Sequence, residues 1–119
     1  MLGIFLTEGA ENRELEKILG RLAELQEKGD AVEVEGEVEL ERLLPQDRSY
    51  FTYPGSLTTP PLHESVTWLV FRQPLSASPA QLQALRQLQT GTGAKKRCLV
   101  NNFRPPCHSG DRVVKFRQV

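Results

Sequence analysis

Apolar residues recur at intervals of three and four over residues 13–28, and this spacing predicts an amphipathic helix. Asn12 suits the N-cap, and Gly29 suits the C-terminal cap. The apolar stripe consists of Leu15, Ile18, Leu19, Leu22 and Leu25. A stripe of this kind predicts packing against a core.

Valine or leucine alternates with glutamate over residues 31–41, with Gly36 as an interruption. A period of two predicts a strand with one solvent-exposed face, and a mobile acidic loop is the alternative. The glutamates also raise the question of a calcium site. Calcium loops place Asp, Asn and Gly at set positions on a curved backbone, and this segment does not.

Further strands are predicted at five places, with the first of them buried: residues 1–7, 49–53, 65–73, 98–101 and 112–118. The first begins without a polar lead-in, so we expect that an N-terminal half of the domain is missing. A mixture of strands and helices without regular alternation favours the α+β class.

A second helix is predicted to start at Ser78, since Pro79 fits the first helical position and Gln81 completes a capping box. We expect Leu82, Leu85 and Leu88 to form its buried face, and Gly91 and Gly93 to follow its end.

The bulk composition is that of a soluble globular domain or part of one: 119 residues, 39% hydrophobic and 25% charged, with a net charge of zero. No apolar run is long enough to span a membrane, and two cysteines are too few for a disulfide scaffold. We therefore expect a cytoplasmic protein. Acidic residues gather in 8–41 and basic residues elsewhere. The bases are scattered, so we expect no nucleic-acid partner.

A stiff loop separates the two central strands, with the sequence Leu57-Thr58-Thr59-Pro60-Pro61. Two prolines stiffen the backbone, and a Pro-Pro bond has an appreciable chance of being cis. A rigid loop can hold a hydroxyl and a backbone N–H in place to stabilise developing negative charge. Taken alone, these residues favour an ordinary rigid turn.

The run Tyr50–Phe71, with its Ser-Leu-Thr-Thr-Pro-Pro core, resembles the active-site segment of the α-carbonic anhydrases of animals, especially the cytosolic members. The resemblance extends over essentially the whole chain, through Leu2–Leu6, Leu43-Leu44-Pro45, Val66-Thr67-Trp68 and Val100–Pro106. It implies that residues 1–119 are the C-terminal portion of a single carbonic anhydrase domain. The implied fold is a mostly antiparallel central β-sheet with peripheral helices.

The resemblance also implies an activity, the reversible hydration of carbon dioxide to bicarbonate and a proton by a zinc hydroxide. Thr58 would orient that hydroxide and its N–H would lie near the substrate. Thr59 would contact the substrate at the mouth of the site, and Leu57 and Trp68 would line the apolar wall. We expect Thr58 at the base of an open cleft, and we expect the full-length form to be a monomer.

The family binds zinc through a His-X-His pair and a third histidine, and this sequence has no such pair. Its two histidines are His63 and His108. We therefore expect no zinc site on this chain and no activity from it alone. Two alternatives remain: a non-catalytic, carbonic-anhydrase-related binding protein, and a truncated product without an independent function.

Overall fold

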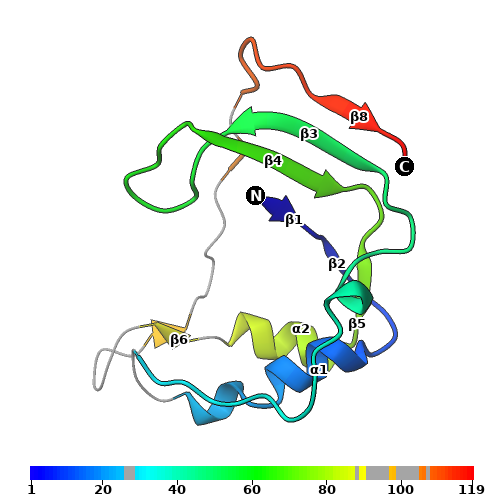
Figure 1. Cartoon of the computed structure of the whole chain (residues 1–119). Helices are drawn as coiled ribbons and strands as arrows, with labels where there is room; N and C mark the ends of the chain where they lie inside the picture. Colours follow the sequence, from blue (N-terminus) through cyan, green and yellow to red (C-terminus); the bar gives the residue numbers. More distant parts are fainter. Residues whose placement is uncertain (26–28, 88, 91–96, 99–104, 107) are drawn as a thin grey trace. The chain divides into compact units, whose positions relative to one another are not determined.

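The computed structural model describes residues 1–25, 29–87, 89–90, 97–98, 105–106 and 108–119. The chain forms two compact units. The sheet unit contains residues 1–5, 44–75 and 105–119, and the helical unit contains residues 6–43 and 76–104. The combination of helices with a mostly antiparallel sheet confirms the α+β class (Figure 1).

The sheet unit is built around a β-hairpin of β3 (Tyr50–Gly55) and β4 (Val66–Phe71), and both strands start one residue and end two residues from the predicted positions. The strands pair antiparallel from Tyr50 opposite Phe71 to Gly55 opposite Val66. β8 (Lys115–Arg117) adds antiparallel to β3, and β1 (Leu2–Gly3) adds parallel to β4. The sheet order is therefore β1-β4-β3-β8 (Figure 1).

The predicted buried strand at residues 1–7 is wrong in length and in burial. The structure has β1 followed by a separate β2 (Leu6–Glu8), which pairs with β5 (Leu75–Ala77). Leu2 and Phe5 are exposed, and β1 forms an edge of its sheet. Among the described residues, the buried apolar side chains are those of Leu19, Pro45, Phe71 and Ala77. The described residues thus leave much apolar surface in contact with solvent.

The predicted helix over residues 13–28 is shorter in the structure. α1 runs from Arg13 to Leu19, and Gly20 is its C-cap in place of the predicted Gly29. Glycine disfavours a helix interior by about 1 kcal/mol relative to alanine, so it is a natural stopping point. A 3₁₀ turn, η1 (Leu22–Glu24), follows, and Leu25 is exposed. The end of the predicted helix at residues 26–28 lies outside the described residues.

The predicted strand at residues 31–41 is also wrong, because the only regular structure in this segment is the 3₁₀ turn η2 (Leu40–Leu43) at its end. Gly36 has φ of +73°, a left-handed conformation that interrupts a regular extended backbone. The alternation persists in exposure, since Val32 and Val34 are half-buried between exposed residues. Side-chain exposure therefore follows the period of the sequence without a ladder of strand hydrogen bonds.

The second helix, α2 (Pro79–Arg86), confirms the predicted start, with Ser78 and Gln81 forming a capping box. Leu82 and Leu85 are half-buried, and Gln81 is the buried residue. Leu88 and Gly91–Gly93 lie outside the described residues. Of the predicted strand at residues 98–101, Cys98 lies in β7 (Arg97–Cys98), which pairs with β6 (Gln89–Thr90), and positions 99–101 lie outside the described residues.

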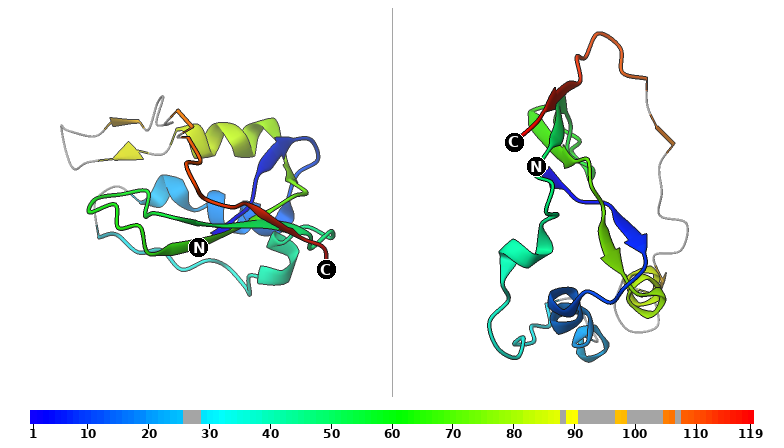
Figure 2. Two further views of the ribbon diagram at one scale, coloured as in Figure 1. Left: turned by 90° about the horizontal axis from the view of Figure 1, so that it is seen from above. Right: turned by 90° about the vertical axis from the view of Figure 1, so that its right-hand side faces the viewer.

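The two helices of the helical unit are tied together at their N-termini (Figures 1 and 2). Asn12 caps α1 by accepting from the N–H groups of Glu14 and Leu15. The Gln81 amide oxygen accepts from the N–H groups of Asn12 and Ser78, at 3.0 and 3.1 Å. Its nitrogen donates to the Asn12 carbonyl and to the Glu16 carboxylate, at 2.8 and 3.0 Å. One buried side chain therefore joins both helix caps.

Candidate functional site

The loop between β3 and β4 (residues 56–65) holds most of the predicted site residues. Its base is closed by a hydrogen bond from the Leu57 N–H to the His63 carbonyl, at 3.0 Å. A tight turn forms its tip, in which the Leu62 N–H donates to the Thr59 carbonyl at 3.0 Å. The Pro60–Pro61 bond in this turn is cis, which agrees with the sequence expectation.

Trp68 supports the loop from the neighbouring strand β4. Its indole Nε1–H donates to the Ser56 carbonyl at 3.2 Å, and the side chain is half-buried. The ring lies against Gly55, where an added Cβ would be 2.6 Å from Trp68 Cδ1 and 3.0 Å from Nε1. A glycine in a strand often marks a close approach of this kind, and this signal identifies a site residue that the motif comparison missed.

The structure brings Leu57 and Trp68 to the base of the loop and leaves both threonines at its surface. Leu57 is half-buried, whereas Thr58 and Thr59 are exposed. The cavity next to the loop, of about 390 Å³, is lined by other residues: Pro54, Gly55, Ser56, Glu64 and His108–Arg112. The expected cleft with Thr58 at its base therefore stays a prediction.

Part of the wall of this cavity is a turn at residues 108–112, which Arg112 holds by two hydrogen bonds. The Arg112 guanidinium donates to the Ser109 carbonyl at 2.8 Å and to the His108 carbonyl at 2.7 Å. His108 is thereby placed at the cavity, while His63 is exposed on the loop. In the part of the chain that the structure describes, no three His, Cys, Asp or Glu side chains gather closely enough to hold a metal ion. Cys107 lies outside that part.

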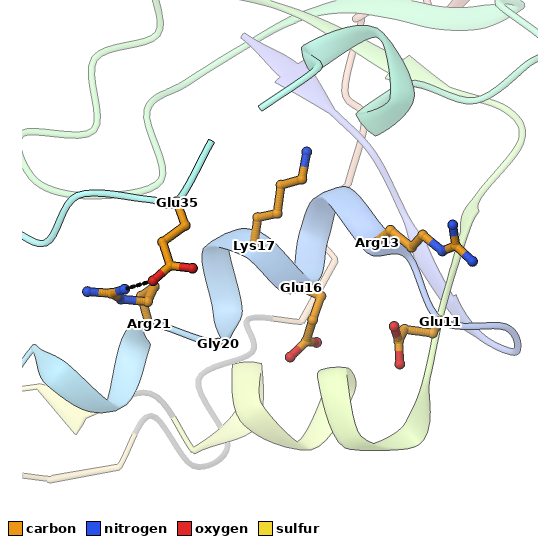
Figure 3. A pocket seen from close by; sticks show the side chains of 7 residues that line it. All are labelled: Glu11, Arg13, Glu16, Lys17, Gly20, Arg21 and Glu35. Atoms are coloured by element: carbon orange, nitrogen blue, oxygen red, sulfur yellow. Dashed lines mark hydrogen bonds and ion pairs between the residues drawn. The ribbon is translucent and has the colours of Figure 1, made fainter. Parts of the chain in front are cut away.

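A second cavity, of about 540 Å³, lies in the helical unit and is lined mainly by charged side chains (Figure 3). They come from α1 and its flanks and from the acidic segment: Glu11, Arg13, Glu16, Lys17, Arg21 and Glu35, together with Gly20. The Glu16 side chain points toward α2, where it accepts from Gln81.

Among the described residues, the carboxyl groups of Glu14 and Asp47 have pKa values below their ordinary range. The ammonium group of Lys17 beside Glu14 lowers the pKa of that carboxyl, with help from the Glu39 N–H. Hydrogen bonds from the Ser49 side chain and backbone lower the pKa of Asp47. Neither group lines the loop at residues 56–65. The lowered pKa values reflect the hydrogen bonds that hold these two side chains in the fold.

Replacing Gly55 with alanine is expected to lower the free energy of unfolding by about 1–3 kcal/mol, because the new methyl group would overlap the Trp68 ring. Urea unfolding would measure the change, and the fluorescence of Trp68, the chain's single tryptophan, would report the displaced ring. Gly3→Ala is the matched control, since the nearest atom there is a Val70 methyl at 3.2 Å. Equal stability of the two variants would contradict the close approach at Gly55.

Comparison with known proteins identifies the family. The family model of eukaryotic-type carbonic anhydrases matches residues 1–118. The chain is 45% identical over 106 residues to the mitochondrial carbonic anhydrase 5A of Rattus norvegicus, covering 88% of this chain and 34% of that protein. It is 41% identical over 116 residues to human carbonic anhydrase 7, covering 97% and 44%.

The mitochondrial carbonic anhydrase 5B of Mus musculus is 42% identical over 116 residues, covering 97% of this chain and 36% of that protein. The chain thus spans from about a third to somewhat less than half of the length of these relatives. The family model nevertheless matches almost the whole of this chain, which is enough to show its family. The chain belongs to the family of eukaryotic-type carbonic anhydrases.

Proposed function

We propose that residues 1–119 supply the substrate-binding side of a carbonic anhydrase, an enzyme that interconverts carbon dioxide and bicarbonate. The match of the family model to residues 1–118 carries this proposal. It is supported by the rigid loop at residues 56–65, which is closed at its base by Leu57 and His63 and supported by Trp68.

Within this proposal, each loop residue has a physical task. The exposed Thr58 hydroxyl and N–H are available to orient a nucleophile and to stabilise an oxyanion, and Thr59 contacts substrate at the mouth. Leu57 and Trp68 are half-buried and offer apolar surface to carbon dioxide, which is a small apolar molecule.

The side chains of this chain do not fit the family's zinc site. Three protein ligands are typical of a catalytic zinc, and the two histidines of residues 1–119 lie in different segments. We therefore propose that the zinc ligands belong to a part of the protein outside these residues, corresponding to the N-terminal portion of the domain. In the family the zinc ion supplies a hydroxide nucleophile near neutral pH.

The proposal is tested by joining residues 1–119 to the part of human carbonic anhydrase 7 that the match leaves out. We expect this chimera to bind one zinc ion and to hydrate carbon dioxide in a stopped-flow assay. The 119-residue chain alone should show no rate above background, because it has no means of generating the nucleophile.

Two outcomes of that experiment would refute parts of the proposal. Zinc-dependent activity of the short chain would refute the placement of the zinc ligands outside it. A chimera that folds and binds zinc but does not hydrate carbon dioxide would refute the catalytic proposal and favour a binding protein of the carbonic-anhydrase-related kind.

The cytoplasmic location and the monomeric state of the full-length form also stay proposals. Two of the relatives compared above are mitochondrial by name. Among the described residues, no helix is both long and apolar enough to cross a membrane.

A further inference from the structure

The outer edge of β1 is open in the sheet unit, and the hydrogen bonds of Met1 show which backbone groups face outward there. The N-terminal ammonium group of Met1 donates to the Thr67 carbonyl at 2.7 Å, and the Met1 carbonyl accepts from the Leu69 N–H at 2.9 Å. Both backbone groups of Met1 therefore face β4. Because successive residues of a strand direct their backbone groups to opposite sides, the N–H and C=O groups of Leu2 face the open edge.

The side chains along this edge are apolar and in contact with solvent. Met1, Leu2 and Phe5 are 48%, 52% and 63% exposed. Residues 1–6 contain neither a charged side chain nor a proline. Natural sheets protect a free edge with charged side chains, prolines or bulges, or they cover it with another element. The composition of this edge is therefore typical of a strand that has a neighbour on both sides.

The opposite edge of the same sheet is formed by β8 and is protected by charge. Two of the three residues of β8 are Lys115 and Arg117, and both are exposed. The third, Phe116, contacts Phe51 of β3, with 5.3 Å between the ring centroids. Because charged side chains discourage a further strand from pairing, the contrast between the two edges directs an incoming strand to β1.

The length of the relatives indicates what the incoming strand belongs to. The chain covers 34% of the carbonic anhydrase 5A of Rattus norvegicus and 44% of human carbonic anhydrase 7, so more than half of each relative lies outside the match. The sheet also needs more covering than residues 1–119 give it. Among the side chains of its four strands, only that of Phe71 is buried.

We propose that the open edge of β1 is the docking site for a strand from the part of the carbonic anhydrase domain that residues 1–119 lack. This inference rests on the proposed function, since the family supplies the occupant. The incoming strand pairs with the N–H and C=O groups of Leu2 and covers the exposed apolar side chains beside them. Only β1 then separates that strand from β4, which carries the loop at residues 56–65.

The test measures hydrogen exchange of the Leu2 amide in the chimera with human carbonic anhydrase 7 and in the 119-residue chain alone. The measured quantity is the protection factor, which corrects each amide for its intrinsic exchange rate. We expect the protection factor of Leu2 to be at least about tenfold higher in the chimera, which is the size of effect that one hydrogen bond produces.

Variants at the two edges locate the docking site. Leu2→Pro removes the outward N–H and keeps the groups of Met1 that face β4, so it should lower the urea midpoint of the chimera but not that of the 119-residue chain. Leu2→Lys adds a charge to the same edge and should act in the same way. Val114→Lys is the matched control beside β8, because Val114 is 53% exposed, and it should leave both midpoints unchanged.

A two-piece form of the experiment does not depend on the covalent link. The part of human carbonic anhydrase 7 outside the match is refolded as a separate polypeptide together with the 119-residue chain. We expect a complex with one copy of each piece, measured by size-exclusion chromatography with light scattering. Leu2→Pro and Leu2→Lys should weaken this complex by about tenfold, and Val114→Lys should not.

Four results would overturn the proposal. Leu2 could have equal protection factors in the chimera and in the 119-residue chain, or Val114→Lys could be as damaging as Leu2→Lys. The 119-residue chain could form a dimer that protects Leu2 as well as the chimera does, which would assign the edge to a second copy. Neither the chimera nor the two-piece mixture could give a folded species, in which case the family's domain does not supply the neighbour of β1.

Failure of the docking proposal is distinguishable from failure of the proposed function, because exchange is measured without substrate. A chimera with a protected Leu2 amide that does not hydrate carbon dioxide would refute the catalytic proposal alone. A chimera that hydrates carbon dioxide with an unprotected Leu2 amide would refute the docking site alone.

Discussion

Replacing Thr58 with alanine in the zinc-bound chimera is expected to lower kcat for carbon dioxide hydration by about 10²-fold. Removal of one positioned hydrogen-bonding group from an active site typically has an effect of this size. Thr58 is exposed on a loop whose ends are fixed by the Leu57–His63 hydrogen bond and by Trp68, so the substitution should leave the loop itself in place. Stopped-flow hydration and zinc content would be measured on the same samples.

Two controls make the Thr58 result specific. Thr58→Ser keeps the hydroxyl and should retain most of the activity. Thr67→Ala changes an exposed threonine on β4 and should have no effect. Full activity of Thr58→Ala with zinc bound would refute the role proposed for this residue, whereas loss of the zinc would show that the residue acts on the fold.

Replacing Gln81 with alanine is expected to destabilise the helical unit by about 3 kcal/mol. The side chain is 2% exposed, and its amide satisfies the N–H groups of Asn12 and Ser78 and the carbonyl of Asn12. Removing it leaves the part-buried N–H groups of Asn12 and Ser78 without their acceptor, each at a cost of about 1–3 kcal/mol before water re-enters, while the Asn12 carbonyl keeps the Glu16 N–H. Gln83→Ala, on the exposed side of the same helix, is the matched control.

Gln81→Glu separates hydrogen bonding from packing. A glutamate fills the same volume, but its carboxylate cannot donate to the Asn12 carbonyl and it faces the Glu16 carboxylate. The new carboxylate can still accept from the Asn12 and Ser78 N–H groups, so the loss of stability relative to wild type comes from the missing donor and from repulsion by Glu16, and protonation at low pH should reduce that loss. Thermal unfolding across pH would show it, and a variant as stable as wild type at neutral pH would contradict the proposed network.

The sequence predicted the elements whose signals are local. Ser78, Pro79 and Gln81 determine where α2 begins, and Asn12 determines where α1 begins, because capping depends on side chains within one turn. The strands on either side of the stiff loop were predicted for a similar reason. The family motif also lies in this loop.

The predictions that failed depend on contacts between residues far apart in the sequence. Valines alternating with glutamates over residues 31–41 indicate a strand, but a strand also needs a neighbour, and here Glu14 and Lys17 bind the backbone of residues 37–39 instead. Likewise, the close approach of Trp68 to Gly55 depends on the register between β3 and β4, which no local pattern specifies.

The order of strands in the sheet has a consequence for how the chain folds. The β3–β4 hairpin joins neighbouring segments, whereas Leu2 pairs with Leu69 and Tyr50 pairs with Arg117. Loop-closure entropy makes such distant pairings late and slow, so the hairpin is the expected nucleus and both outer strands dock onto it afterwards. Until they dock, the nucleus has two open edges, and nascent chains at high concentration would pair with one another there.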